Sequence, residues 1–283
     1  TGCIQQVAFG SQNRATARVL ARNGAEVAAP REQTCCGALH AHAGEHDLAV
    51  ALAKRTIQVF EAATVDGVVV NTSGCAAHMK AYGTLLAADP VWRERAERFA
   101  SQVRDLSEFL AAEPLRGPLG PVDRKVTYHD PCHIVHGQKI SRQPRTLLAQ
   151  IPGLTVVPLK EADWCCGSAG TYNLTQPEMA RQLQERKVAH IRETGAEAVV
   201  TANPGCIIQI VQGLEAARAP VKVLHLAELL DESYRNAPRL SPPHPTLSPQ
   251  GRGDRPNPSP LPGRGGPAIP PPNPSPPSGE RAG

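Results

Sequence analysis

Short apolar runs separated by longer amphipathic stretches fill the first 235 residues of this 283-residue chain. The runs at Val68–Val70, Leu154–Val157 and Ala198–Thr201 are typical of buried parallel strands. Val126–His129 and Val221–Leu224 have the same character. Because such runs alternate with helical stretches, the pattern predicts α/β modules in which helices flank a mostly parallel sheet.

Two of the intervening stretches carry helix signals. Arginines recur every four residues between Arg14 and Arg22 and leave an apolar face on the other side, and Gly24 is placed to end that helix. The segment Thr175–Glu178 has the spacing of a capping box with proline in the first turn. We expect the helix that it starts to run to Gly195, which suits a C-terminal cap.

The eight cysteines divide this part of the chain into two similar halves. Each half has, in order, a single cysteine, a Cys-Cys-Gly triplet and a Gly-Cys pair. The first set is Cys3, Cys35, Cys36 and Cys75, and the second is Cys132, Cys165, Cys166 and Cys206. Corresponding cysteines lie 129 to 131 residues apart, and segments 103–110 and 223–230 also echo one another. Such a regular offset predicts two related modules.

The repeat predicts the domain boundaries. We expect a first module at 1–113, a linker rich in proline and glycine at 114–125, a second module at 126–235 and a tail at 236–283. A strand precedes Cys132 but only two residues precede Cys3, so we expect the first strand of module one to be missing and the chain to be truncated at its N-terminus. The tail holds 16 of the 28 prolines and few apolar residues, which predicts disorder.

Composition and motifs exclude several classes of function. The net charge is +4 and aromatic residues make up 4% of the chain, so nucleic-acid binding is disfavoured. The chain has no run of 18 apolar residues that would predict a membrane-spanning helix. It also lacks a Walker loop, a dinucleotide-binding glycine motif and a serine-hydrolase elbow. We therefore expect no residue that transforms a substrate.

The placement of the cysteines suggests their chemistry. In a parallel α/β module the loops at the carboxyl ends of the strands converge, so three loops deliver four thiols to one rim. Four thiolates form the ligand set of a [4Fe–4S] cluster and also of a structural zinc ion. Gly37 and Gly167 permit the turn that aims two adjacent cysteines at one metal.

Other interpretations of the cysteines remain open. Disulfides are disfavoured because nothing indicates an oxidising compartment. A thiol–disulfide reductase would need a reactive pair instead of permanent ligation, and buried structural thiols would not explain a duplicated pattern. Among the histidines His78 is the best candidate ligand because it lies three residues after Cys75, although its counterpart in module two is Gln209. We expect His129 and the other histidines near cysteines to support ligands or to lie in polar loops.

Four motifs carry a family resemblance. They are Thr34-Cys-Cys-Gly-Ala-Leu-His-Ala-His-Ala-Gly-Glu45, Tyr128-His-Asp-Pro-Cys-His133, Trp164-Cys-Cys-Gly-Ser-Ala-Gly-Thr-Tyr-Asn173 and Asn203-Pro-Gly-Cys206. The pattern resembles the cysteine-rich CCG domain of heterodisulfide reductase and its relatives. More closely, it resembles the iron–sulfur subunit of bacterial glycolate oxidase, also called glycolate dehydrogenase, over essentially all of residues 1–235.

The resemblance implies an electron-transfer role in which each cysteine set holds one iron–sulfur cluster. Flavoprotein subunits carrying FAD would oxidise glycolate to glyoxylate, and this chain would pass electrons toward the quinone pool. Such a subunit would be cytoplasmic, at the inner face of the membrane. Lactate-utilisation and anaerobic glycerol-3-phosphate dehydrogenase subunits share the domain, and the Gly-Ala-Leu-His-Ala-His segment after Cys36 favours glycolate. A structural zinc and subunit-docking module is the alternative from a different class.

The sequence departs from the resembled families in two ways. It lacks the ferredoxin-like segment with C-x₂-C-x₂-C-x₃-C-P motifs, in line with the expected truncation. The heterodisulfide reductase pattern ends each set with C-x-x-C, whereas here His78 and Gln209 occupy the last position. This loss argues against non-cubane clusters and against disulfide reduction.

Overall fold

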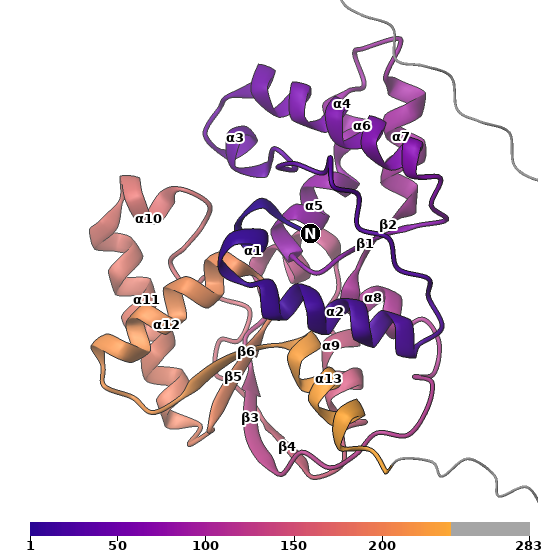
Figure 1. The fold of residues 1–283 in the computed structure, drawn as a ribbon. Helices are drawn as coiled ribbons and strands as arrows, with labels where there is room; N and C mark the ends of the chain where they lie inside the picture. The colour runs from indigo at the N-terminus through magenta and orange to yellow at the C-terminus, as the bar shows by residue number, and fades with distance from the viewer. Residues whose placement is uncertain (239–283) are drawn as a thin grey trace, which may run out of the picture. The chain divides into compact units, whose positions relative to one another are not determined.

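Two parallel sheets, one in each half of the chain, organise the fold (Figure 1). The computed structural model describes residues 1–238, so the predicted disorder of the tail from residue 239 onward lies outside the described residues. The first sheet pairs β1 (Val68–Val70) with β2 (Val103–Asp105). The second has the order β4-β3-β5-β6, with strands β3 (Arg124–Tyr128), β4 (Leu154–Val157), β5 (Ala198–Thr201) and β6 (Lys222–His225). The predicted α/β class with mostly parallel sheets is confirmed.

Helices occupy the chain between these strands. In the first half they are α1 (Cys3–Ala8), α2 (Gly10–Arg22), α3 (Ala38–His42), α4 (His46–Ala63), α5 (Ser73–Lys80), α6 (Tyr82–Leu85), α7 (Arg93–Gln102) and α8 (Leu106–Leu110). In the second half they are the π-helical turn η1 (His133–Gly137), α9 (Gln143–Leu148), α10 (Tyr172–Thr175), α11 (Pro177–Glu193), α12 (Pro204–Ala216) and α13 (Leu226–Asn236). Within the described residues no helix has the length and apolar character needed to cross a membrane.

The predicted strands form with small shifts in their ends. Strands β1, β4 and β5 occupy the predicted residues, while β3 begins two residues early and β6 ends one residue late. The expectation that β4 is buried is wrong, because Thr155 and Val156 are exposed. Strand β4 lies at the edge of its sheet and pairs only with β3, so it has fewer neighbours to cover it.

The predicted capping box at the start of α11 is also wrong. The helix begins at Pro177 and its N-cap is Gln176, which makes no side-chain capping hydrogen bond. Thr175 instead ends the short helix α10. Proline does lie in the first turn, as predicted, where its missing N–H costs nothing. Gly195 follows the helix with φ of 59°, in line with its predicted role at the end.

Equivalent segments of the two halves fold alike. Strand β2 leads directly into α8, and β6 leads directly into α13. Asp105 is the N-cap of α8 and forms a capping box with Glu108. His225 is the N-cap of α13 and forms a capping box with Glu228. The repeat that the sequence predicts is therefore visible in local structure.

The two halves share a hydrophobic core. Helix α2, which forms where the arginine spacing predicts it, buries Val19 and Leu20 against residues of α13. The Arg18 guanidinium pairs with the Asp231 carboxylate at 2.7 Å across this contact. His225 Nδ1 accepts a hydrogen bond from the backbone of its own helix, so its Nε2–H donates to the Asn71 carbonyl at 2.9 Å. These contacts join the halves within one compact unit.

The two sheets differ at one edge. Strand β5 pairs with both β3 and β6, whereas β1 pairs with β2 alone among the residues that the structure describes. The predicted domain boundaries stay a prediction.

Candidate metal centres

The first cysteine set comes together from three segments. Cys3 begins α1, Cys35 and Cys36 precede α3, and Cys75 lies in the first turn of α5. The side chain of Cys35 is within hydrogen-bonding reach of those of Cys3 and Cys36. Cys36 in turn reaches Cys75. The four thiols are therefore neighbours in the order Cys3, Cys35, Cys36 and Cys75, and we call them the first quartet.

The second cysteine set occupies the equivalent position in the other half. Cys132 precedes η1, Cys165 and Cys166 lie in the loop after β4, and Cys206 lies in the first turn of α12. These four cysteines, which we call the second quartet, line one cavity of about 20 Å³. Cys166 is within hydrogen-bonding reach of Cys165 and Cys206. The predicted convergence of thiols thus occurs in both halves.

A left-handed glycine makes the same turn in both quartets. Gly37 has φ of 88° and Gly167 has φ of 95°. The backbone N–H of Gly37 donates to Cys35 Sγ at 3.4 Å, and that of Gly167 donates to Cys165 Sγ at 3.3 Å. Any side chain at Gly167 would collide with the carbonyl of Ala180. Glycine therefore permits the turn and supplies a donor to sulfur, as the sequence predicts.

One asparagine connects the second quartet with the first half of the chain. Asn203 donates from Nδ2 to Cys206 Sγ at 3.6 Å. Its Oδ1 accepts a hydrogen bond from the backbone N–H of Gly74 at 3.2 Å, next to Cys75. The side chain therefore orients one thiol while it contacts the residue before another.

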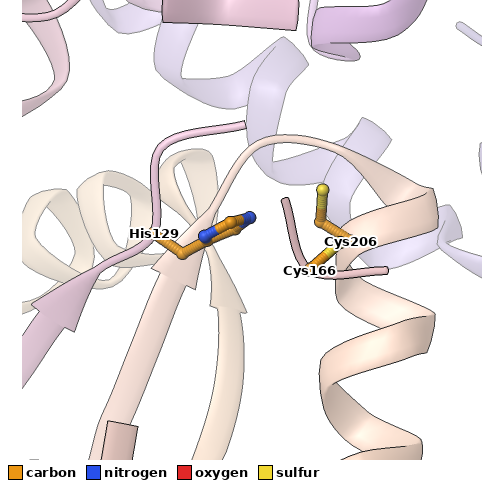
Figure 2. A group of neighbouring side chains, drawn as sticks. All are labelled: His129, Cys166 and Cys206. Carbon is orange, nitrogen blue, oxygen red and sulfur yellow. The ribbon is translucent and has the colours of Figure 1, made fainter. Parts of the chain in front are cut away.

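His129 lies against the second quartet. It follows β3 directly, and its backbone N–H donates to the Val200 carbonyl at 2.9 Å. Its side chain is 1% exposed, and neither ring nitrogen has a hydrogen-bond partner. A ring nitrogen of His129 and the sulfurs of Cys166 and Cys206 all lie within 4.8 Å of one another (Figure 2). Burial lowers the pKa of His129 to about 3, so the ring is neutral at physiological pH.

A buried lysine also lies near the second quartet. Lys187 on α11 is 2% exposed, and its ammonium donates to the Glu161 carbonyl. Burial lowers the Lys187 pKa, and the nearby Cys166 and Glu161 act in the opposite direction. A buried ammonium near thiols favours their ionised form.

The model of a known family matches both quartets. It is described as a cysteine-rich domain, CCG, and it matches residues 1–80 and 126–211. These two ranges contain all eight cysteines. The chain belongs to the CCG cysteine-rich domain family. Because each range holds one quartet, the CCG domain occurs here twice.

Known proteins with similar sequences support this membership. The "Probable glycolate oxidase iron-sulfur subunit" of Bacillus subtilis is 39% identical over 82% of this chain and 53% of that protein. The glycolate oxidase iron-sulfur subunit of Escherichia coli is 34% identical over 82% of this chain and 56% of that protein. Lactate utilization protein A of an Exiguobacterium species is 35% identical over 83% of this chain and 96% of that protein. The chain thus spans about half the length of the two glycolate oxidase subunits.

The two histidines differ in their surroundings, and the ligand role of His78 stays a prediction. His78 has a buried Nε2 without a hydrogen-bond partner and packs edge-on against Tyr82, with ring centroids 5.4 Å apart. Within residues 1–238 the close group of metal-binding side chains contains His129 and not His78. The sequence signal that could have identified His129 as a candidate ligand is its position directly after a buried strand and three residues before Cys132.

Proximity of the thiols determines their protonation. Hydrogen bonds from Cys3 and Cys36 hold the pKa of Cys35 well below its usual value. The hydrogen bond to Cys35 and burial raise the pKa of Cys3. In the second quartet, the hydrogen bond to Cys166 and burial raise the pKa of Cys165. Four clustered thiols therefore cannot all ionise by themselves, and a bound cation would stabilise the thiolates.

The donor set fits a metal centre. Thiolates are the ligands that iron–sulfur clusters and zinc prefer. Both ring nitrogens of His129 are buried without a hydrogen-bond partner, which a bound metal ion would supply. The cavity of about 20 Å³ in the second quartet accommodates a single ion as it stands. A larger cluster requires the cysteine side chains to move apart.

Proposed function

We propose that this chain is the cluster-binding part of an iron–sulfur electron-transfer subunit that serves a flavin-dependent glycolate dehydrogenase. The observation that carries the proposal is the duplicated quartet of thiols at matching places in two CCG domains. The names of the similar B. subtilis and E. coli proteins support it. A bound cluster supplies a one-electron carrier, of [4Fe–4S] type given four cysteines per quartet.

The residues around the quartets would tune such a carrier. The N–H groups of Gly37 and Gly167 and the Asn203 amide donate to cysteine sulfurs. Hydrogen bonds to sulfur withdraw electron density and raise the reduction potential, and burial excludes water from the site. The protein thereby sets the potential, while the flavin chemistry stays on another subunit.

The proposed partners follow from the same proposal. Glycolate oxidation to glyoxylate releases two electrons and two protons, which FAD on a flavoprotein subunit would accept together. The CCG domains would then receive single electrons and pass them toward the quinone pool at the cytoplasmic face of the membrane. Lactate is the alternative substrate, because Lactate utilization protein A is similar over nearly its whole length. The sequence after Cys36 favours glycolate.

Anaerobic reconstitution with iron and sulfide tests the cluster. We expect a brown protein with an EPR signal on reduction and iron in both modules. Each module serves as the control for the other, because Cys36→Ser affects only the first quartet and Cys166→Ser only the second. A chain that takes up no iron under these conditions contradicts the proposal.

A structural zinc module is the second candidate. The small volume of the second cavity and the close group of His129, Cys166 and Cys206 favour a single ion. This candidate predicts a colourless protein that is purified with zinc and has no redox signal. Metal analysis of protein isolated anaerobically from its native host distinguishes zinc from iron directly.

Co-purification tests the partner and the substrate. A tagged chain co-expressed with the flavoprotein subunits of a glycolate oxidase should retain those subunits. Glycolate should bleach the flavin and then reduce the clusters in the assembled complex. Reduction by lactate and not by glycolate would assign the chain to lactate utilisation.

A further inference from the structure

A fully buried histidine without a partner is the unexplained feature of the second module. His129 is held by its backbone at the end of β3, where its N–H pairs with the Val200 carbonyl. Its ring is 1% exposed, yet neither nitrogen donates or accepts a hydrogen bond. A buried imidazole without a partner costs free energy, so the fold retains it for a reason other than packing.

The ring is directed at two sulfurs. Figure 2 shows His129 pointing from the end of its strand toward Cys166 and Cys206. The three ligand atoms lie within 4.8 Å of one another and come from three separate elements. Cys132 and Cys165 line the same cavity. His133 lines this cavity too, with its Nδ1 3.6 Å from Cys132 Sγ, but His129 is the histidine whose ring nitrogen lies within 4.8 Å of both Cys166 and Cys206.

The surroundings keep the ring able to coordinate. Metal binding requires a neutral imidazole with a free lone pair. No carboxylate in the described residues hydrogen-bonds to the ring, so its lone pair stays free.

We infer that His129 is a ligand of the metal centre in the second module, which is therefore held by nitrogen and sulfur together. This inference rests on the proposed function for the identity of the metal, but the ligand role itself holds for iron or zinc. The close group of ligand atoms found in residues 1–238 consists of His129, Cys166 and Cys206, all in the second module.

A nitrogen ligand gives the two centres different properties. A [4Fe–4S] cluster offers four ligand positions, so a His129 ligand takes one of them in place of a thiolate, which makes the centre less negative and raises its reduction potential, as histidine ligands do in Rieske centres. The buried Lys187 acts in the same direction. The second module is then the stronger electron acceptor of the pair, and electrons move from the first module to the second.

Pulsed EPR on the reconstituted, reduced full-length chain tests the ligand. We expect a strongly coupled ¹⁴N signal from one centre, replaced by ¹⁵N when histidine is labelled. The signal should vanish in His129→Ala and persist in His136→Ala, a control on the exposed side of η1. His129→Cys should retain iron, lose the nitrogen coupling and lower the potential of that centre.

The outcomes separate this inference from the proposed function. An iron centre without nitrogen coupling, or coupling that survives in His129→Ala, overturns the inference and leaves the electron-transfer proposal standing. If no iron binds, Co²⁺ titration and X-ray absorption of the apo-protein replace pulsed EPR. A bound ion with one nitrogen donor that His129→Ala removes then supports the ligand role, and an all-sulfur ion contradicts it.

Discussion

The two CCG modules use the same scaffold to build two different sites. In both, a left-handed glycine follows the paired cysteines and donates its N–H to the first sulfur. The first quartet consists of four neighbouring thiols. In the second, a buried histidine and a buried lysine join the thiols. Duplication preserves the turn that gathers the sulfurs, while the surrounding side chains are free to differ.

Lys187 shows this divergence most clearly. At the 130-residue offset of the paired cysteines, Lys187 on α11 corresponds to Ile57 on α4. Both side chains are buried, at 2% and 0% exposure. The same interior position is therefore apolar in one module and charged in the other. We expect the difference to appear in the properties of the two centres.

Loss of one quartet should have the largest effect. Cys36→Ser and Cys166→Ser should each remove about half of the bound iron, because each variant removes a thiolate ligand from its own quartet. Iron and sulfide analysis with EPR measures this, and the double variant should bind almost none. Full iron loss from either single variant would show one shared centre instead of two.

Alanine in place of the glycine that follows each cysteine pair should destabilise the protein, and by more in the second module than in the first. Gly167→Ala should destabilise the protein by about 3 kcal/mol, because left-handed backbone strain adds to a collision with Ala180. Gly37→Ala should cost less, since its nearest obstacle is the Ala49 carbonyl at 3.2 Å. Gly44→Ala is the matched control, with φ of 83° and open space around it, and should cost about 1 kcal/mol.

Urea denaturation of the apo-proteins measures these differences. Equal losses for all three glycines would contradict the tight packing inferred around Gly167.

Acid should weaken the contact between the halves. Burial lowers the pKa of His225. Below about pH 6.5 this imidazole is therefore protonated in the unfolded chain while it is still neutral in the folded chain. The stability from this group is therefore complete above that pH and falls by up to about 1.4 kcal/mol per pH unit below it. His225→Asn should reduce this slope. Denaturation of apo-protein between pH 7.5 and 5.5 measures it, with exposed His46→Asn as the control.

Removal of the buried charge should have the smallest effect, confined to one module. Lys187→Met should lower the reduction potential of the second centre and leave the first unchanged, because a nearby cation favours the reduced, more negative state. Redox titration followed by EPR measures both centres in one sample. Arg181→Met on the exposed face of the same helix should change neither, and a shift of both centres would contradict a local effect.

The sequence was sufficient for the scaffold and for the cysteines. Their register predicts two modules, and apolar runs predict β1, β4 and β5 at the observed residues. The sequence was not sufficient to predict features that depend on tertiary contacts, such as where α11 begins and where the His129 ring lies. The Thr175 capping box fails because the chain turns at Gln176 instead. Spacing favoured His78, and the place of His129 after a strand was a weaker signal, because only the folded structure shows that the His129 ring lies beside Cys166 and Cys206.

Mössbauer spectroscopy of the reconstituted wild-type chain at stepwise potentials tests the two-site account most directly. We expect two iron populations of equal size that are reduced at different potentials, the second module at the higher one. A single population reduced in one step, or no bound iron, would contradict the claim that two thiol quartets hold two distinct centres.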